Sequence, residues 1–128
     1  MSAPATEASP KMLAWLKEQA AAVKRLEAEA EDALYNKDDK ALHHDLMVQK
    51  ASLLAAMKTD AAPLLDSVPE QLQSPLLSRL AAFSQGAQNA LSLNSVFYMS
   101  ALLYPDNHMA GQPNNLELLI AALENGRC

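Results

Sequence analysis

The chain has 128 residues and a formal net charge of −5, and half of its residues are hydrophobic. Alanine and leucine account for 24 and 22 residues, whereas valine, isoleucine and threonine together account for seven. Strands favour β-branched residues, while helices favour alanine and leucine. The composition therefore predicts an all-α fold, excludes a sheet protein, and suits a single domain over residues 10–128.

Several other classes are disfavoured by charge and cysteine content. Lysine and arginine form no cluster that would contact phosphates, so nucleic-acid binding is not expected. The one cysteine, Cys128, excludes an intramolecular disulfide or zinc–thiolate cluster and favours a cytoplasmic location. Residues 1–9 lack the pattern of a signal peptide and are predicted to be disordered. The uncharged stretch between residues 79 and 106 is rich in serine, glutamine and asparagine, which argues against membrane insertion.

The first half of the chain predicts an antiparallel helical hairpin. A first helix is expected from Pro10, behind the potential cap Ser9, to about Asn36. A polar turn follows, and Asp38 or Asp39 is expected to cap the second helix. The first apolar stripe is Met12, Leu16, Ala20, Val23, Leu26, Ala30, Ala33 and Leu34; the second is Leu42, Leu46, Leu53 and Met57, with Gln49 or Lys50 filling the gap.

The second half predicts a linker, a third long helix and a short final helix. The linker, residues 60–74, is expected to dock through Leu64, Leu65, Val68 and Leu72. The third helix is expected over residues 75–103, opened by Ser74-Pro75 and ended by Tyr104-Pro105. A loop over residues 106–113 leads to a helix over residues 114–124, stopped by Asn125-Gly126. Heptad spacing in the long helices is typical of a coiled-coil-like bundle.

No arrangement of reactive side chains predicts an enzyme. His43, His44 and Asp45 are consecutive and therefore point in different directions on a helix, so we expect two solvated histidines and no metal site. No glutamate has a histidine three residues later, as di-iron bundles require. Cys128 is terminal, which is a poor position for a nucleophile, and the glycines form no phosphate loop. We expect neither a cofactor nor a catalytic residue.

The uneven distribution of charge is the most informative feature. Residues 1–60 hold 18 of the 25 charged residues, whereas residues 71–103 hold only Arg79. A helix of such low charge is either enclosed by its own chain or covered by a partner. Asn94 lies in a heptad row, where it would fix helix register or bind a partner's backbone. The candidate partner-binding residues, expected to line a groove for an amphipathic helix, are Leu80, Phe83, Leu91, Asn94, Phe97, Tyr98, Leu102, Leu116 and Ile120.

Two stretches of the chain resemble the FlgN-type flagellar export chaperones. They are residues 35–42, YNKDDKAL, and residues 49–54, QKASLL. In that family a similar short polar turn is followed by a leucine-rich helix around a Lys-x-x-Leu-Leu core. Asn89 and Asn94 resemble the asparagine-bearing stretch of the family's long helix. The similarity covers residues 10–104, whereas the loop at 106–113 and the short final helix depart from the pattern.

The resemblance implies a cytoplasmic chaperone without catalysis or cofactor. Such a protein binds the C-terminal segments of hook–filament junction proteins, keeps them unassembled and delivers them to the flagellar type III export machinery. The apolar seams also admit a second interpretation, because they are able to pair two copies of the chain. In that case the protein is a self-associating helical bundle, such as a homodimer, acting as a structural or regulatory adaptor subunit.

Overall fold

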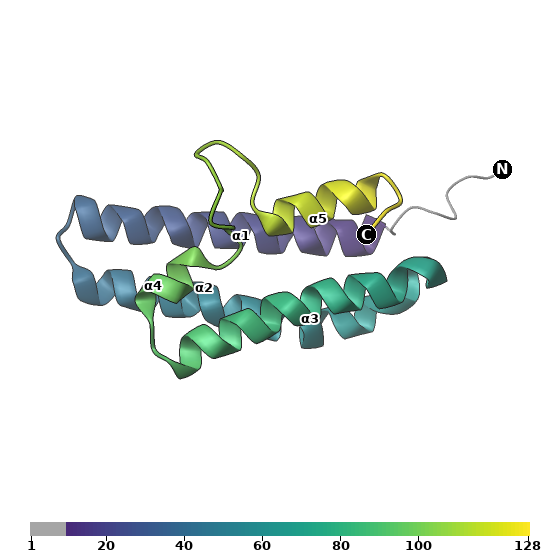
Figure 1. Ribbon diagram of the computed structural model, residues 1–128, viewed down its shortest axis with the longest axis horizontal. Coiled ribbons are helices and arrows are strands. Elements are labelled where there is room, and N and C mark those ends of the chain that lie inside the picture. Colours follow the sequence, from purple (N-terminus) through teal and green to yellow (C-terminus); the bar gives the residue numbers. More distant parts are fainter. Residues whose placement is uncertain (1–9) are drawn as a thin grey trace.

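The computed structural model describes residues 10–128, over which the chain forms five α-helices and one 3-10 helix (Figure 1). The predicted all-α fold is confirmed. Residues 1–9, with the predicted cap Ser9 and the predicted disorder, lie outside the described residues. In chain order the elements are α1 (Pro10–Tyr35), α2 (Lys40–Ala61), η2 (Ala62–Ser67), α3 (Glu70–Ser92), α4 (Val96–Ala101) and α5 (Asn115–Glu124).

The predicted hairpin is confirmed, and Asp39 is its cap. The Asp39 side chain accepts a hydrogen bond from the Leu42 backbone N–H at 2.9 Å, while Asp38 takes the left-handed conformation with φ 49°. α1 and α2 then run side by side (Figure 1). The predicted stripe of α1 is buried from Met12 to Ala33. In α2 the gap is filled by Lys50, whose side chain is fully buried.

The third helix begins earlier than predicted. α3 starts at Glu70, so the expected opening at Ser74-Pro75 is wrong, and Pro75 lies inside the helix. Pro69 directly precedes the helix, and its fixed φ suits that position. The linker is correspondingly shorter, with η2 at its centre. It docks as predicted, because Val68 is buried while Leu64 and Leu65 pack against the core; Leu72 is also buried, as part of α3.

The third helix also ends earlier than predicted. α3 stops at Ser92, Asn94 has φ 49°, and the short α4 starts at Val96. The Ser95 side chain caps α4 by accepting from the Tyr98 backbone N–H at 3.2 Å. The predicted helix over 75–103 is therefore wrong, and so is the role of Asn94 as a register residue within it. Serine and asparagine bond to nearby backbone and tolerate turns, which here overrides a continuing heptad pattern.

The backbone of Asn94 leads to a stability prediction. Replacing Asn94 by valine places a β-branched residue at positive φ, and we expect a loss of about 1–2 kcal/mol in the free energy of unfolding. Asn94→Gly removes the same side chain but accepts that φ without strain. Urea unfolding of both variants separates backbone strain from side-chain loss; equal stability of the two would show that φ is not the cause.

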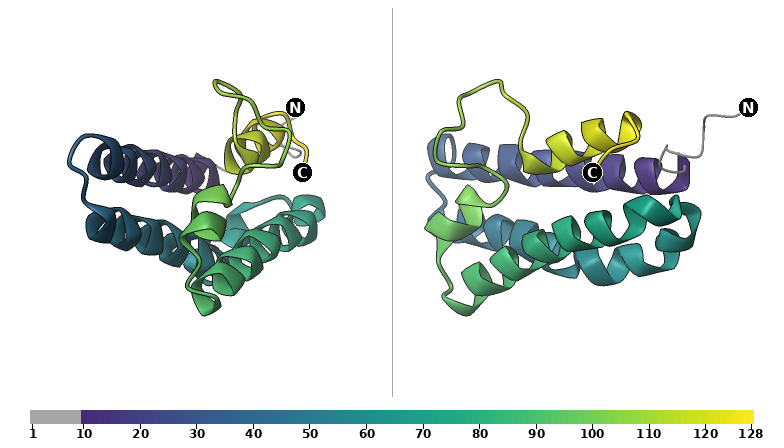
Figure 2. Two further views of the ribbon diagram at one scale, coloured as in Figure 1. Left: turned by 60° about the vertical axis from the view of Figure 1, so that its left-hand side comes forward. Right: turned by 45° about the vertical axis from the view of Figure 1, so that its right-hand side comes forward.

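The C-terminal part folds back onto the hairpin. The loop over residues 105–113 arches away from the helices, and α5 lies along α1 (Figures 1 and 2). The Asn115 N–H donates to the Leu103 carbonyl at 2.9 Å and closes this loop. Asn114 and Glu117 form a reciprocal capping box at the start of α5. The predicted stop is confirmed by Gly126, which has φ 72°.

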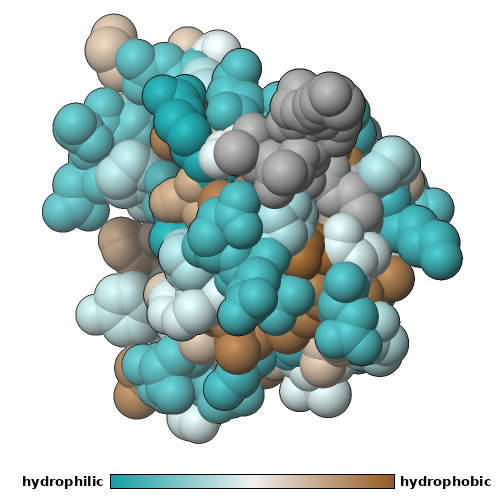
Figure 3. Space-filling model, turned by 90° about the vertical axis from the view of Figure 1, so that its right-hand side faces the viewer, coloured by the Kyte–Doolittle hydropathy of each residue, from teal (hydrophilic) through white to brown (hydrophobic). Residues whose placement is uncertain are grey.

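The core consists of two apolar clusters along the bundle. The larger joins α1, α2, α3 and α5, and the smaller joins the opposite halves of α1 and α2 to α3 and α4. Hydrophobic side chains also reach the surface at the end of the bundle seen in Figure 3, between hydrophilic ones. α5 covers α1, but a hollow remains between α3 and the start of α5.

Candidate functional site

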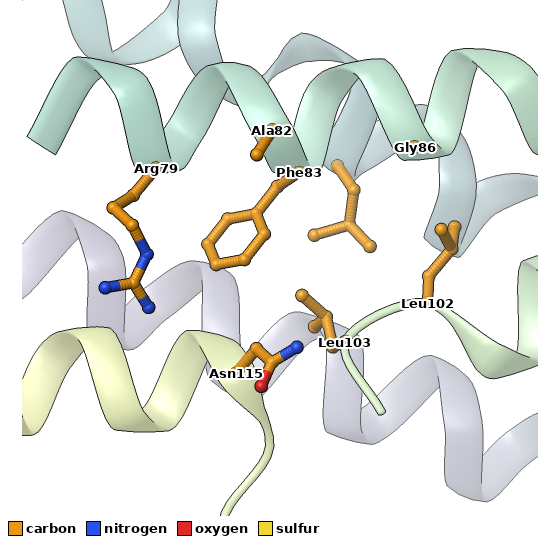
Figure 4. A pocket seen from close by; sticks show the side chains of 8 residues that line it. Arg79, Ala82, Phe83, Gly86, Leu102, Leu103 and Asn115 are labelled. Atoms are coloured by element: carbon orange, nitrogen blue, oxygen red, sulfur yellow. The ribbon is translucent and has the colours of Figure 1, made fainter. Parts of the chain in front are cut away.

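A first hollow lies between α3 and the start of α5. It has a volume of about 430 Å³. Phe83 projects into it from α3, while Leu103 and Asn115 project from the opposite side (Figure 4). Arg79 reaches from α3 toward α5 at one end of the hollow (Figure 4). The full lining of this first hollow is Leu54, Arg79, Ala82, Phe83, Gly86, Leu102, Leu103 and Asn115.

A second hollow lies between α3 and α4 and has a volume of about 420 Å³. Its rim carries two exposed apolar side chains, Leu93 at 65% and Tyr98 at 55% exposure. Phe97, 67% exposed, stands beside it in an edge-to-face contact with Tyr98. The lining contains no charged residue and comprises Gly86, Asn89, Ala90, Leu93, Tyr98, Ala101 and Leu102.

The two hollows adjoin at Gly86 and Leu102, which line both. Their α3 residues recur every three or four positions from Arg79 to Leu93, so they form one face of that helix. These 15 residues span about 21 Å at 1.5 Å per residue. We call the two adjoining hollows the α3 groove. It is a shallow, mainly apolar surface of helix length, with Arg79 as the charged residue in its lining.

The structure separates the predicted partner-binding residues into three groups. Phe83, Tyr98 and Leu102 line the α3 groove, and Phe97 lies exposed beside it. Leu91 packs against the smaller core cluster. Leu80, Leu116 and Ile120 are buried in the larger core cluster, so they offer no surface to a partner.

The remaining predicted residue, Asn94, is engaged within the chain. Its side-chain oxygen lies 2.9 Å from His44 Nε2, and His43 Nδ1 lies 3.0 Å from the Ala30 carbonyl. Both histidines are partly buried, but 37% of the His44 side chain stays exposed, so the expectation of two solvated histidines is wrong for His43 and holds in part for His44. The hairpin places His43 against the Ala30 carbonyl of α1, whereas the turn between α3 and α4 brings Asn94 to His44.

Several groove residues were missed by sequence reasoning. Ala82, Gly86 and Leu93 lie on the side of α3 next to its buried stripe, and Asn115 comes from a segment distant in sequence. One feature of the sequence could have indicated Leu93: it directly precedes Asn94 and Ser95, residue types that favour a turn and so the end of a helix. Gly86 faces Leu102 across the groove, and a Cβ added there would make an ordinary van der Waals contact with Leu102 Cδ2 at 3.7 Å.

A buried polar cluster holds α4, which forms one wall of the groove, against the hairpin. Lys50 Nζ of α2 donates to the Ser100 carbonyl of α4 at 3.0 Å and lies 2.9 Å from Glu27 Oε2 of α1. Glu27 Oε2 therefore forms an ion pair with Lys50, but the geometry of the contact does not meet the criteria for a hydrogen bond. The Tyr104 hydroxyl donates to Glu27 Oε1 at 2.6 Å, and its ring lies 5.1 Å from Lys50 Nζ. The cluster thus connects three segments of the chain.

Burial governs the titration of this cluster. It lowers the pKa of Lys50, and the Glu27 carboxylate opposes that shift. Burial, followed by the hydrogen bond to Glu27, raises the pKa of Tyr104 well above the usual tyrosine value. Desolvation disfavours the charged form of either group, which explains the opposite directions. At the C-terminus, burial also raises the pKa of the Cys128 thiol, which packs against the core.

The Tyr104 shift has a defined consequence at alkaline pH. Below pH 10.0, the usual tyrosine pKa, the phenol is protonated in both the folded and the unfolded chain. Above it the unfolded chain loses this proton first, so the folded chain binds more protons and its stability falls as pH rises. We expect Tyr104→Phe to be less stable at neutral pH by about 1–2 kcal/mol, from the lost hydrogen bond to a carboxylate. Urea unfolding between pH 9 and pH 11 should show a steeper decline for the wild type, and parallel curves would contradict the assignment.

Within residues 10–128 no group of three or more histidine, cysteine, aspartate or glutamate residues is placed to hold a metal ion. None of the described helices is both long and apolar enough to cross a membrane.

Comparison of the chain with protein-family models, with curated proteins and with solved structures finds no match.

Proposed function

We propose that the protein is a chaperone of flagellar type III export that binds the C-terminal helical segment of hook–filament junction proteins and prevents their premature assembly. The observation that carries the proposal is the α3 groove, an open apolar surface about four helical turns long. The stretches at residues 35–42 and 49–54 supply the family to which the proposal refers.

Helix-in-groove binding accounts for the features of this surface. An amphipathic helix docks by placing apolar side chains at positions i, i+3, i+4 and i+7 into a complementary groove. Small residues such as Ala82, Gly86 and Ala101 let the two backbones approach closely. The exposed rings of Phe97 and Tyr98 are of the type enriched in interface cores. The net charge of −5 favours solubility of a chaperone that shields an apolar client in the cytoplasm.

Calorimetry of the purified chain with the C-terminal segment of a hook–filament junction protein from the same genome tests the proposal. We expect one segment bound per chain, and binding lost in Leu93→Asp. Leu118→Asp is the matched control, because Leu118 is 48% exposed on α5 and lies outside the groove lining. Circular dichroism should show unchanged helix content in both variants. Wild-type binding that survives Leu93→Asp, or no binding at all, would contradict the proposal.

The second candidate is the self-associating adaptor, favoured by the exposure of Phe97 and Tyr98 on one side of α4. Sedimentation equilibrium distinguishes it directly. The chaperone proposal expects a monomer that gains the mass of one client segment. A dimer that ignores the segment and dissociates in Leu93→Asp would support self-association instead.

A further inference from the structure

The α3 groove consists of two hollows, and their separation constrains what fits. On α3 the first hollow centres between Ala82 and Phe83 and the second between Asn89 and Ala90, seven residues later. Seven residues correspond to about 10 Å along a helix, or two turns. A helix docked along α3 therefore reaches both hollows with side chains at positions i and i+7. The lining of the second hollow is almost entirely apolar, and in the first hollow Phe83, Leu102 and Leu103 stand beside the polar Arg79 and Asn115, so both of these side chains are expected to be large and apolar.

The two hollows meet at Gly86 and Leu102, which line both. Gly86 has no side chain, and a Cβ added there would make only an ordinary van der Waals contact with Leu102 Cδ2 at 3.7 Å. At this point a partner helix can therefore come close to the α3 backbone. A large partner side chain would hold the two helices apart, so we expect a small residue at i+3 or i+4, the positions that face Gly86.

The first hollow ends in a positive charge. Arg79 lies one turn before the centre of that hollow, and its side chain reaches across the groove mouth toward α5 (Figure 4). It is the one charged residue between residues 71 and 103. Within residues 10–128 its guanidinium makes no ion pair or hydrogen bond, although its charge acts on the nearby Cys128 thiol and lowers the pKa of that group against the larger effect of burial. A carboxylate beside Arg79 would complete the pair, and docking would remove water from it and strengthen the attraction.

We propose that the partner of the α3 groove is an amphipathic helix with large apolar side chains at i and i+7, a small residue midway between them, and a carboxylate at i+10 or i+11. The proposed helix runs antiparallel to α3. Its i residue fills the second hollow, its i+7 residue fills the first, and its carboxylate pairs with Arg79. This inference rests on the proposed function only because it takes a protein helix as the occupant of the groove. The pattern of partner side chains is derived from the two hollows and Arg79, and not from the resemblance to a family.

Fluorescence anisotropy with capped, labelled 18-residue peptides tests the pattern. The reference peptide carries leucine at i and i+7, alanine at i+3 and i+4, glutamate at i+10, and polar residues elsewhere. Changing that glutamate to glutamine should weaken binding to the wild type about tenfold. The same change should have no effect on Arg79→Gln, and Arg79→Glu should prefer a peptide with lysine at that position. Lys40→Gln, which removes an exposed charge outside the groove lining, is the matched control and should behave as the wild type.

A second series tests the hollows. Moving the second leucine from i+7 to i+4, or replacing the midway alanines by leucine, should weaken binding at least about tenfold, since one anchor is then lost or held away. Equal affinity of all these peptides, or an effect of glutamate that persists in Arg79→Gln, would overturn the inference while leaving a helix-binding function in place. If neither these peptides nor a natural client segment binds, the proposed function itself fails. A wild-type dimer that Leu93→Asp dissociates would identify a second copy as the occupant and would also overturn it.

Discussion

Replacing Glu27 by leucine should destabilise the protein by about 3 kcal/mol, the range found when one partner of a buried ion pair is removed. The Lys50 side chain is fully buried, whereas Glu27 is 20% exposed. Without Glu27, Lys50 keeps the Ser100 carbonyl and the Tyr104 ring as partners but no counter-charge. Its pKa is already lowered by burial and would fall further once the opposing carboxylate is gone.

A double-mutant cycle measured by urea unfolding gives the decisive control. Lys50→Met should cost less than Glu27→Leu, because Glu27 is partly solvated and keeps the Tyr104 hydroxyl at 2.6 Å. The combined variant should recover most of the stability, since an apolar pair replaces the ion pair. A combined variant as unstable as Glu27→Leu alone would show that the cost came from lost packing. A Glu27→Leu variant within about 0.5 kcal/mol of the wild type would show that the pair is not effectively buried.

Leu80→Ala should lower the free energy of unfolding by about 3 kcal/mol, within the range for deleting a buried leucine side chain. Leu80 is fully buried in the larger core cluster, where its removal leaves a cavity between packed helices. Leu93→Ala makes the same chemical change at the C-terminal end of α3, where the side chain is 65% exposed. Its free energy of unfolding should stay within about 0.5 kcal/mol of the wild-type value. Thermal and urea unfolding compare the two.

This pair also separates stability from binding. Leu80 and Leu93 are both apolar residues of the low-charge segment, yet only Leu93 lines the α3 groove. Loss of client binding in Leu93→Ala without loss of stability would locate the interaction at the surface. Similar destabilisation by the two substitutions would contradict the burial that distinguishes them.

The buried polar cluster lies next to one wall of the α3 groove in the chain. Lys50 and Glu27 hold Ser100 and Tyr104, which flank the wall residues Ala101 and Leu102. A variant that disrupts the cluster while remaining folded is therefore expected to weaken groove binding indirectly. Such an effect identifies Lys50 as a positioning residue for α4.

The sequence by itself determined the helical class, the hairpin and most of its buried stripe. These features depend on local rules, since leucine and alanine at spacings of three and four define one face of a helix wherever it packs. The cap at Asp39, the docked linker and the stop at Gly126 follow equally local chemistry. For the gap in the apolar stripe of α2 the pattern allowed either Gln49 or Lys50, and Lys50 is the residue that is buried.

Only the tertiary structure decided where the third helix breaks and which of its faces remains open. The heptad rows continue through residues 93–95, so periodicity alone carried the predicted helix past Asn94, whereas local hydrogen bonding and a positive φ end it there. Leu80, Leu116 and Ile120 match Phe83 and Tyr98 in apolar character, but Leu80 lies in the core where α3 packs on α2, and Leu116 and Ile120 lie in it where α5 packs on α1. Hydrophobic patterning predicts that a side chain avoids water, but it does not predict which neighbouring element covers that side chain. The groove exists because α5 lies along α1, so that only its start and α4 border this side of α3.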